Sequence, residues 1–403
     1  MPYTKLNDKL SRTSNAPGPI RILHVVGGMV RAGTETWLMH ILRQIDRQQF
    51  QMDFLVYTHE SCPYDNEIRA LGSRVIPCTL KRFQPWSFNA NFKRIIKDYG
   101  TYDIVHSHVH HFSGLVLRAA KQAGVPVRIA HSHNDTTPVD SQASILRRLY
   151  ISLSESWIKS NATLGLAASE DAAVNLFGAD WQKDPRWRIL CCGIDLTAFQ
   201  TPGIIDGAVR AELNIPSDAL VFGHVGRFEA QKNHHFLLEV AAQVVRHEPK
   251  AYFLLIGDGP LRSEIEAEAA SLGIGERVIF AGLRSDVPQL MMEVMNAFIF
   301  PSLYEGLGLA LVEAQAAGLP CILSDVIPAE ADIAVPLIKR ISLRQSSLYW
   351  AQEMLNHYHQ ASTVAQLDAL AMVSRSPLNV STSLAQLTEI YQAQITHDKQ
   401  YES

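Results

Sequence analysis

Two glutamates and two glycines lie close together in residues 305–313, EGLGLALVE, after a short apolar run and at the start of a helical pattern. Gly306 and Gly308 have no side chain to keep a ligand away from the backbone. The helix that follows presents unpaired N–H groups and the positive end of its dipole, which suit a phosphate or a sugar hydroxyl. Glu305 precedes this helix, and Glu313 lies two turns inside it, ~12 Å further along. The two carboxylates could therefore hold hydroxyl pairs on either side of a phosphate; an ordinary capped helix with a solvated Glu313 is the alternative.

Two cations form a second candidate group in residues 224–240, HVGRFEAQKNHHFLLEV. Arg227 and Lys232 lie between a predicted strand and a predicted helix. Two positive charges at the end of a strand can neutralise a diphosphate and stabilise it as a leaving group. Exposed Arg and Lys side chains are common and usually only solvated, so the pair gains its meaning from its combination with residues 305–313.

Four histidines end another predicted strand in residues 103–111, DIVHSHVHH. Alternation along the strand puts His106 and His108 on one face, where an imidazole could hydrogen-bond a sugar hydroxyl or a developing negative charge. Packed or solvated side chains are the alternative for at least two of the four. The HxH spacing also occurs in metal sites. Because no cysteine or carboxylate cluster accompanies it, we predict no metal ion, and no other cofactor.

Short runs rich in Val and Ile alternate with helical patterns along most of the chain. Such strands, buried on both faces, are typical of parallel sheets covered by helices. The pattern predicts two doubly wound α/β domains, with ligands at the carboxyl ends of the strands, where the two domains face each other across a cleft. The predicted strands are 20–26, 52–57, 74–78, 103–106, 127–131, 163–168 and 187–191 in the first half, and 219–225, 251–256, 277–281, 297–300 and 320–323 in the second.

The length of 403 residues favours two domains. We predict a flexible tail at 1–19, a first domain at 20–197, a second domain at 198–375 and a helical segment at 376–403 that could pack back on the first domain. Residues 1–195 carry 23 Lys and Arg against 17 Asp and Glu, whereas residues 196–403 carry 13 against 23. This asymmetry indicates either different partners for the two domains or scatter among solvated faces.

Composition narrows the class of protein further. Hydrophobic residues make up 47% of the chain and charged residues 19%, which is typical of a folded protein. No signal-peptide pattern and no apolar run of the ~20 residues of a membrane span is visible. Five cysteines without CxxC spacing favour reduced thiols and a cytoplasmic protein, and argue against a disulfide scaffold.

The order of four motifs, GRFEAQKN, IGDGPL, FAGLRSDVPQL and PSLYEGLGLALVEAQAAGLP, resembles the retaining glycosyltransferases of family four, which have the GT-B fold. The resemblance covers about residues 20–340 and implies that residues 20–197 are the acceptor domain and residues 198–375 the donor domain. GGMVRAGTET, DIVHSHVHHFSG, VPVRIAHSHND and SDVIPAEADI look like the exopolysaccharide and capsular polysaccharide branch of that family. Two departures are Leu307, where the family usually has Phe, and Cys192, where Asn is usual. The backbone donor survives at Leu307, and Cys192 is expected in the hinge, away from the chemistry.

The resemblance implies a role for each matching residue. Arg227 and Lys232 would contact the donor diphosphate, and Glu313 the ribose. Glu305 and the backbone N–H groups of Leu307, Gly308 and Leu309 would contact the transferred sugar and the distal phosphate. The loop 27–36 would close on the donor and the acceptor, with Gly33 and Glu35 as candidates, although residues 34 and 35 could simply open a helix. His108 would be the active-site histidine, with His106 as the fallback and His131 and His133 facing the same cleft. The resulting catalytic set is His108, Glu305, Arg227 and Lys232, and the donor-binding set is Gly33, Arg227, Lys232, Glu305, Gly306, Leu307, Gly308, Leu309 and Glu313.

The resemblance further implies a UDP-sugar as donor, with a GDP-sugar as second choice, a glycan or lipid-linked glycan as acceptor, and no nucleic acid partner. Residues 80–99, LKRFQPWSFNANFKRIIKDY, mix cations with aromatic side chains and suggest peripheral contact with an anionic membrane at the inner face of the plasma membrane. A solvated helix whose aromatic side chains belong to the core is the alternative. A nucleotide-sugar epimerase of the same fold, a histidine-based metal-dependent hydrolase and a non-catalytic sugar-nucleotide-binding protein are the competing functions.

Overall fold

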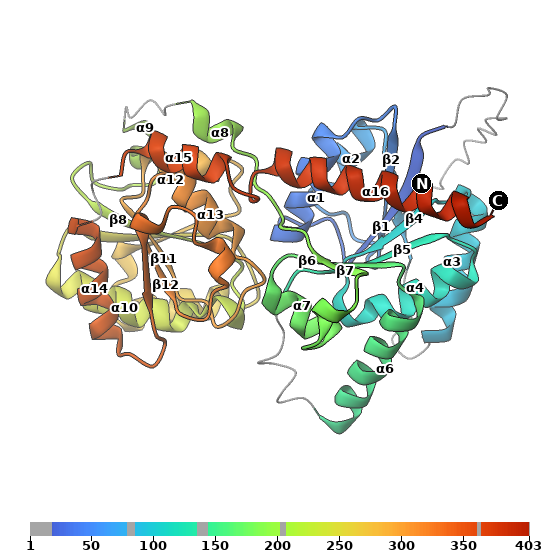
Figure 1. Cartoon of the computed structure of the whole chain (residues 1–403). Coiled ribbons are helices and arrows are strands. Elements are labelled where there is room, and N and C mark those ends of the chain that lie inside the picture. The colour runs from blue at the N-terminus through green and yellow to red at the C-terminus, as the bar shows by residue number, and fades with distance from the viewer. Residues whose placement is uncertain (1–17, 79–84, 135–143, 202–206, 361–363, 403) are drawn as a thin grey trace.

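A computed structural model of the chain describes residues 18–78, 85–134, 144–201, 207–360 and 364–402 (Figure 1). Within these residues, the strands form one parallel sheet of seven strands and one of six, each with helices on both faces. The predicted class, two doubly wound parallel sheets, is confirmed. The predicted tail lies almost entirely outside the described residues, as do residues 202–206 near the start of the predicted second domain.

The first sheet has the strand order β3-β2-β1-β4-β5-β6-β7. Its strands are β1 (Ile20–Val26), β2 (Phe50–Val56), β3 (Val75–Pro77), β4 (Ile104–Ser107), β5 (Val127–Ser132), β6 (Leu164–Ala167) and β7 (Trp187–Ile189). One face packs on α1 (Gly33–Gln44), α2 (Asp65–Ala70) and α16 (Val380–Glu402). The other packs on α3 (Pro85–Tyr99), α4 (Ser113–Gln122), α6 (Ile145–Asn161) and α7 (Glu170–Phe177).

The second sheet has the order β10-β9-β8-β11-β12-β13. Its strands are β8 (Leu220–Val225), β9 (Ala251–Ile256), β10 (Val278–Gly282), β11 (Ala297–Phe300), β12 (Cys321–Ser324) and β13 (Ile338–Ile341). One face packs on α10 (His234–His247), α11 (Arg262–Ser271) and α14 (Ser347–Gln360). The other packs on α8 (Thr197–Gln200), α9 (Ala208–Glu212), α12 (Val287–Glu293), α13 (Leu309–Ala316) and α15 (Gln366–Ser374).

Strand β13 was not predicted, because the sequence around residue 340 reads as the start of a helical tail. The strand is short, lies at the edge of the sheet and has the sequence IKRI. Both of its charged side chains are paired: Lys339 with Glu353 at 2.6 Å and Arg340 with Asp332 at 2.8 Å. An edge strand needs no continuous apolar run, so hydrophobic patterning does not reveal it.

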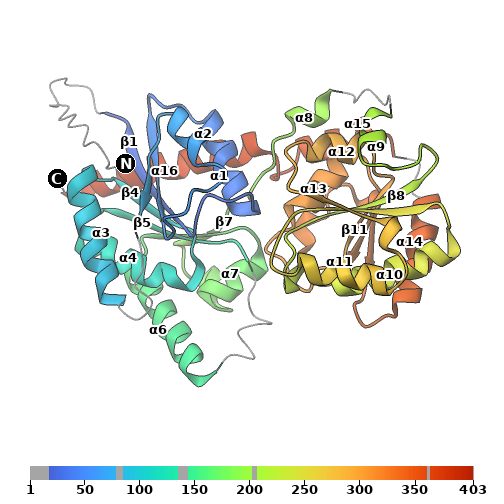
Figure 2. The same ribbon diagram turned by 180° about the vertical axis from the view of Figure 1, so that it is seen from behind.

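The chain crosses twice between the two sheets, and the two crossings lie side by side (Figures 1 and 2). Ile194 donates its N–H to Leu378 O at 2.8 Å, and Val380 donates to Ile194 O at 2.9 Å. A Cβ atom at Gly193 would lie 2.5 Å from the backbone of Asn379, so only glycine permits this approach. Beyond the crossing, α16 lies on the first sheet, and Trp37 Nε1 donates to Ser383 Oγ at 3.3 Å.

The aromatic side chains of α3 that the structure describes belong to the core. Phe88 and Phe92 are fully buried among α3, α4 and the first sheet. The predicted membrane contact through these two aromatic residues is therefore wrong. Of the other members of the predicted patch, Lys93, Arg94 and Lys97 are exposed on α3, whereas residues 81–83 and the Trp86 side chain lie outside the described residues. No helix in the described parts of the chain is both long and apolar enough to cross a bilayer.

Candidate active site

The loop at residues 305–308 meets the first domain directly. A Cβ atom at Gly306 would lie 1.5 Å from the carbonyl oxygen of His133, which follows β5. Leu309 packs against the cores of both domains, and a Cβ atom placed on Gly33, at the start of α1, would lie 3.7 Å from the Leu309 side chain. The predicted donor loop, the Gly33 loop and the end of β5 therefore come together where the carboxyl ends of the two sheets meet.

The start of α13 has the backbone form that suits an anion. Gly308 is the N-cap residue, in the left-handed conformation at φ 83°, and no side chain caps the helix. The first N–H groups of α13 are therefore left for a ligand or water. Leu307 is buried in the core of the second domain, so the departure from Phe at this position keeps an apolar anchor for the loop.

Glu305 is buried and bound on both carboxylate oxygens. Lys232 Nζ donates to Oε1 at 2.5 Å, and Gln231 Nε2 donates to Oε2 at 3.3 Å. Lys232 Nζ also lies 4.8 Å above the ring of Phe300, at the end of β11. Sequence reasoning placed Lys232 and Glu305 in one site but did not foresee that they form an ion pair, and it missed Gln231.

Arg227 lies at the edge of the same region and is more exposed. Its Nε contacts Glu229 Oε1 at 3.0 Å, and the Arg227 side chain is 56% exposed. Glu35, in the first turn of α1, faces it from the other domain: burial raises the pKa of Glu35 to about 7, and the charge of Arg227 opposes that rise. Arg227 is thus the more exposed of the two cations, whereas the Lys232 side chain is only 17% exposed.

Glu313 lies on α13 without a partner for its carboxylate in the described part of the chain. Burial alone raises the pKa of Glu313 to about 7. A carboxylate held in this way is costly unless a ligand supplies hydrogen-bond donors. In the described chain the Glu313 side chain is only partly buried, so its carboxylate can reach either solvent or the hydroxyl pair of a ligand.

Five histidines cluster beneath the Gly306 contact in two hydrogen-bonded groups whose rings pack against each other. Nδ1 of His24 lies 3.0 Å from Nε2 of His108, whose Nδ1 lies 2.8 Å from Nε2 of His133. Nε2 of His106 lies 3.2 Å from Nδ1 of His131. Burial lowers the pKa of all five rings, so they are neutral at physiological pH.

His108 therefore reaches the donor loop through His133, whose carbonyl contacts Gly306. His106 lies deeper, fully buried, with its Nδ1 2.7 Å from the hydroxyl of Tyr391 on α16. Cys192 Sγ lies 3.4 Å from Nδ1 of His133, so this position adjoins the histidines and not only the hinge, contrary to the prediction.

Two sets of three histidines lie close enough to hold a metal ion: His24 with His106 and His108, and His108 with His131 and His133. Their ring nitrogens lie within 4.8 Å of one another. Most of these nitrogens already hydrogen-bond a neighbouring ring, which is an alternative way to satisfy buried imidazoles. The geometry thus permits a metal ion without requiring one.

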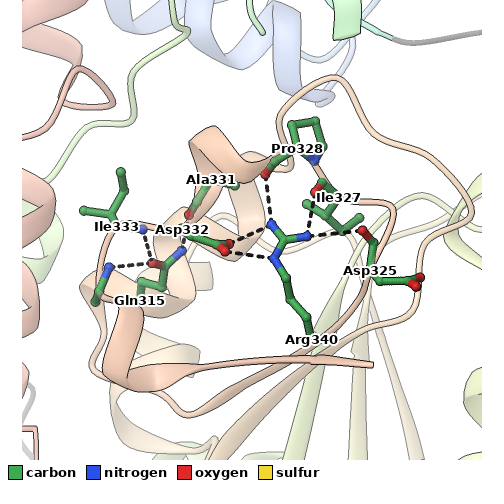
Figure 3. Close-up of polar contacts among 9 residues, drawn as sticks. Gln315, Asp325, Ile327, Pro328, Ala331, Asp332, Ile333 and Arg340 are labelled. Atoms are coloured by element: carbon green, nitrogen blue, oxygen red, sulfur yellow. Dashed lines mark hydrogen bonds and ion pairs between the residues drawn. The ribbon is translucent and has the colours of Figure 1, made fainter. Parts of the chain in front are cut away.

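A polar network that the sequence did not reveal fixes the loop after β12 (Figure 3). Arg340 binds Asp332 through two hydrogen bonds, at 2.8 and 2.9 Å, and donates to the carbonyls of Ile327 and Pro328. Gln315, on α13, donates to Ala331 O at 2.8 Å and accepts from two backbone N–H groups. The network joins this loop to the donor helix.

From the same loop, Glu330 Oε1 accepts a hydrogen bond at 2.8 Å from the N–H of Glu170, at the start of α7 in the first domain. The network of Arg340 and Gln315 therefore braces a second contact between the domains. No local signal in the sequence distinguishes these residues from solvated ones, because each acts through partners elsewhere in the chain.

Two protein-family models match the chain. The model described as glycosyl transferases group 1 matches residues 207–346, and the glycosyl transferase 4-like domain matches residues 32–190. The chain is 40% identical over 334 residues to the putative glycosyltransferase EpsF of Bacillus subtilis (strain 168), covering 82% of this chain and 86% of that protein.

Further relatives are more distant. The chain is 26% identical over 316 residues to the UDP-Gal:alpha-D-GlcNAc-diphosphoundecaprenol alpha-1,3-galactosyltransferase of Escherichia coli, covering 76% of this chain and 80% of that protein. Among solved structures, Anabaena Alr3699/HepE in complex with UDP-glucose superposes with a TM-score of 0.75 at 19% identity, over 93% of this chain and 99% of that chain. At this identity the superposition supports the fold alone.

Proposed function

Because the chain belongs to the family-four glycosyltransferases of the GT-B fold that act in polysaccharide biosynthesis, we propose that it transfers a sugar from a nucleotide-diphosphate sugar, with retention, to a hydroxyl of a lipid-linked glycan. The observation that carries the proposal is the arrangement of Lys232 and Glu305 beside the uncapped start of α13. A cation and free N–H groups suit a diphosphate, and a carboxylate suits a sugar hydroxyl.

In this proposal the diphosphate lies between Lys232, Arg227 and the N–H groups of Leu307, Gly308 and Leu309. These groups stabilise the negative charge that develops as the bond between the sugar and the diphosphate breaks. Glu313 accepts hydrogen bonds from the ribose hydroxyls, which supply the donors that its partly buried carboxylate lacks.

The acceptor hydroxyl attacks the anomeric carbon on the side from which the diphosphate departs, so the configuration is retained. The hydroxyl proton passes to an oxygen of the departing phosphate, so no dedicated base is required. Glu305 positions the transferred sugar. His108 acts on the same site indirectly, because it hydrogen-bonds His133, whose carbonyl contacts Gly306. The contacts of Gly306 and Glu330 with the first domain hold the two domains together. The donor and the acceptor then keep a fixed relative orientation, and water is excluded from the site.

UDP is the proposed nucleotide and GDP the second choice. The galactosyltransferase of Escherichia coli uses UDP-Gal and a diphosphoundecaprenol-linked acceptor, by its description, and Alr3699/HepE was solved with UDP-glucose. Both likenesses favour a UDP-sugar and a lipid-linked acceptor for this chain, which would then work at the inner face of the plasma membrane. The transfer needs no metal ion, since cations of the chain balance the diphosphate.

A thermal-shift screen of UDP-, GDP- and ADP-sugars tests the donor site. We expect one class to raise the melting temperature of the wild type, and Glu305→Ala and Lys232→Ala to lose that rise. Lys339→Ala is the matched control, because it removes an ion pair of the same domain away from the site. Full retention of the rise by both site variants would show that the donor binds elsewhere.

Two further measurements separate the competing functions. NMR of the identified donor with enzyme but no acceptor shows a new epimer only if the chain is an epimerase. Transfer after dialysis against EDTA should be unchanged. Loss of transfer that Zn²⁺ restores would contradict metal independence and would direct attention to the two histidine sets.

A further inference from the structure

The first half of helix α6 projects from the body of the first domain (Figures 1 and 2). Only Ser154 and Ile158 of its 17 residues are buried, and both lie in the second half. They pack α6 on α4, where the backbone of Ser154 closely approaches Gly114. Residues 145–153 thus extend beyond the part of the helix that the fold holds in place.

This projecting half carries a large apolar surface. Five apolar side chains are exposed there: Ile145 (77%), Leu146 (80%), Leu149 (63%), Tyr150 (45%) and Leu153 (48%). At 100° per residue they fall within an arc of about 140° on the side of the helix away from Ser154 and Ile158. No other helix of the described chain exposes more than two large apolar side chains. Single exposed leucines need no explanation, but a continuous face of five does.

The surroundings of this face are basic. The three adjoining helices α3, α4 and α6 carry eight Lys or Arg residues against two Asp or Glu. They form one layer: Asn89 Nδ2 donates to Gln122 Oε1 between α3 and α4, and Arg118 lies over the Trp157 ring between α4 and α6. Within the projecting half, Arg147 and Arg148 fall outside the apolar arc, on the other side of the helix. An apolar face set in a basic layer complements a surface that is apolar inside and negative outside.

We propose that the exposed face of α6 docks on the surface of a bilayer that contains anionic lipid. The apolar side chains would enter the boundary between headgroups and acyl chains, and the cations of α3, α4 and α6 would lie among the headgroups. The proposal rests on the proposed function, because a lipid-linked acceptor is presented at such a surface. It moves the membrane contact from the aromatic residues of α3, which are buried, to α6.

The packing of α6 links this surface to the site. The hydroxyl of Ser154 donates to the carbonyl of His111, in the short helical turn that follows β4 and His108. The helix is therefore anchored to the segment that carries the active-site histidine. Docking of α6 would set the first domain, and with it the acceptor side of the site, at a fixed position relative to the membrane.

Vesicle sedimentation tests the proposal on the full-length protein. We expect the wild type to sediment with vesicles of equal parts phosphatidylcholine and phosphatidylglycerol, and not with phosphatidylcholine alone. The double variant Leu146→Ser/Leu149→Ser should bind on the order of ten-fold or more weakly, because two side chains leave the apolar boundary. Added salt should weaken wild-type binding, since screening removes the attraction of the cations.

Leu367→Ser is the matched control. Leu367 is also an exposed leucine, at 65%, but it lies on α15 in the second domain, so its loss should leave vesicle binding unchanged. Equal sedimentation of the double variant and the wild type, or no sedimentation of the wild type, would overturn the proposal. So would a wild-type dimer that the double variant converts to a monomer, because a second copy of the chain would then cover the face.

Thermal shifts with the donor separate this proposal from the proposed function. The α6 variants should keep the full donor-induced shift, because α6 is not part of the donor site. Vesicle binding without a shift from any nucleotide sugar would refute the donor assignment and leave the docking surface standing. A donor shift without vesicle binding would refute the docking surface alone.

Discussion

Replacing Lys232 with Met should destabilise the second domain more than any exposed charge replacement does. The ammonium of Lys232 lies 2.5 Å from Glu305, and the two side chains are only 17% and 7% exposed. Met keeps most of the apolar stem of Lys232, so the change removes the charge and leaves the Glu305 carboxylate buried without its cation. Gln231 is then its remaining side-chain partner, at 3.3 Å.

The size of the effect follows from this burial. Breaking a buried ion pair by removing one partner costs about 3–5 kcal/mol, mostly from the uncompensated charge. Because the Lys232 side chain retains some contact with water, we expect the lower end, about 3 kcal/mol. Glu305→Gln in the same chain removes the stranded charge, so the double variant should return to within about 1 kcal/mol of the wild type.

Urea unfolding of the wild type, both single variants and the double variant gives a double-mutant cycle. The free energies of unfolding are taken from the transition of the second domain. Lys339→Met is the control: Lys339 lies 2.6 Å from Glu353, but the two side chains are 41% and 22% exposed. Its loss should cost under about 1 kcal/mol. A Lys232→Met cost as small as that of the control, or no recovery in the double variant, would refute the reasoning from burial.

Three further outcomes are expected. Gly306→Ala places a Cβ atom 1.5 Å from a carbonyl oxygen of the other domain, so kcat/KM should fall ~10- to 100-fold while both domains unfold as before. Gly275→Ala is the control and should leave kcat/KM unchanged, because its Cβ atom would lie at an ordinary van der Waals distance from Ala270. The pKa of Glu313 is raised from 4.5 to about 7, so between these pH values the folded protein binds a proton that the unfolded chain releases, and the free energy of unfolding should fall by up to about 3 kcal/mol as pH rises. Glu313→Gln should lack this decrease, and the same pH dependence of unfolding in both proteins would contradict the assignment. Tyr391→Phe leaves buried His106 without its hydroxyl partner and should cost about 1–2 kcal/mol in urea unfolding; a cost near zero would mean that the bond contributes nothing.

The elements that the sequence predicted are those whose signal is local. Twelve of the thirteen strands in the described chain match predicted runs, because a strand buried on both faces must be apolar throughout its length. Strand β13 escaped detection because its lysine and arginine are paired with side chains from α14 and the preceding loop. The start of α10 shows the limit of local rules: Asn233 is the N-cap residue, but its side chain donates to Pro301 O instead of capping the helix.

The same division holds for the candidate site. Arg227, Lys232 and the Gly306 loop were recognisable because each follows a strand in a glycine-containing or basic segment. The side chains that hold the site residues were not recognisable. Gln231, which binds Glu305, resembles any surface glutamine, and Tyr391, which binds His106, lies 285 residues away from it. Cys192 was assigned to the hinge and also adjoins His133.

The sequence by itself determined two parallel sheets, the family and the glycine-flanked start of α13, because hydrophobic period and glycine placement act over a few residues. Only the tertiary structure decided that Gly306 meets His133, that five histidines form one buried cluster and that the apolar face of α6 stays uncovered while Phe88 and Phe92 are buried. These outcomes depend on which surfaces the packed elements leave for one another. A helical apolar pattern shows that a face needs a partner, and the packing of the whole chain decides whether the fold supplies it.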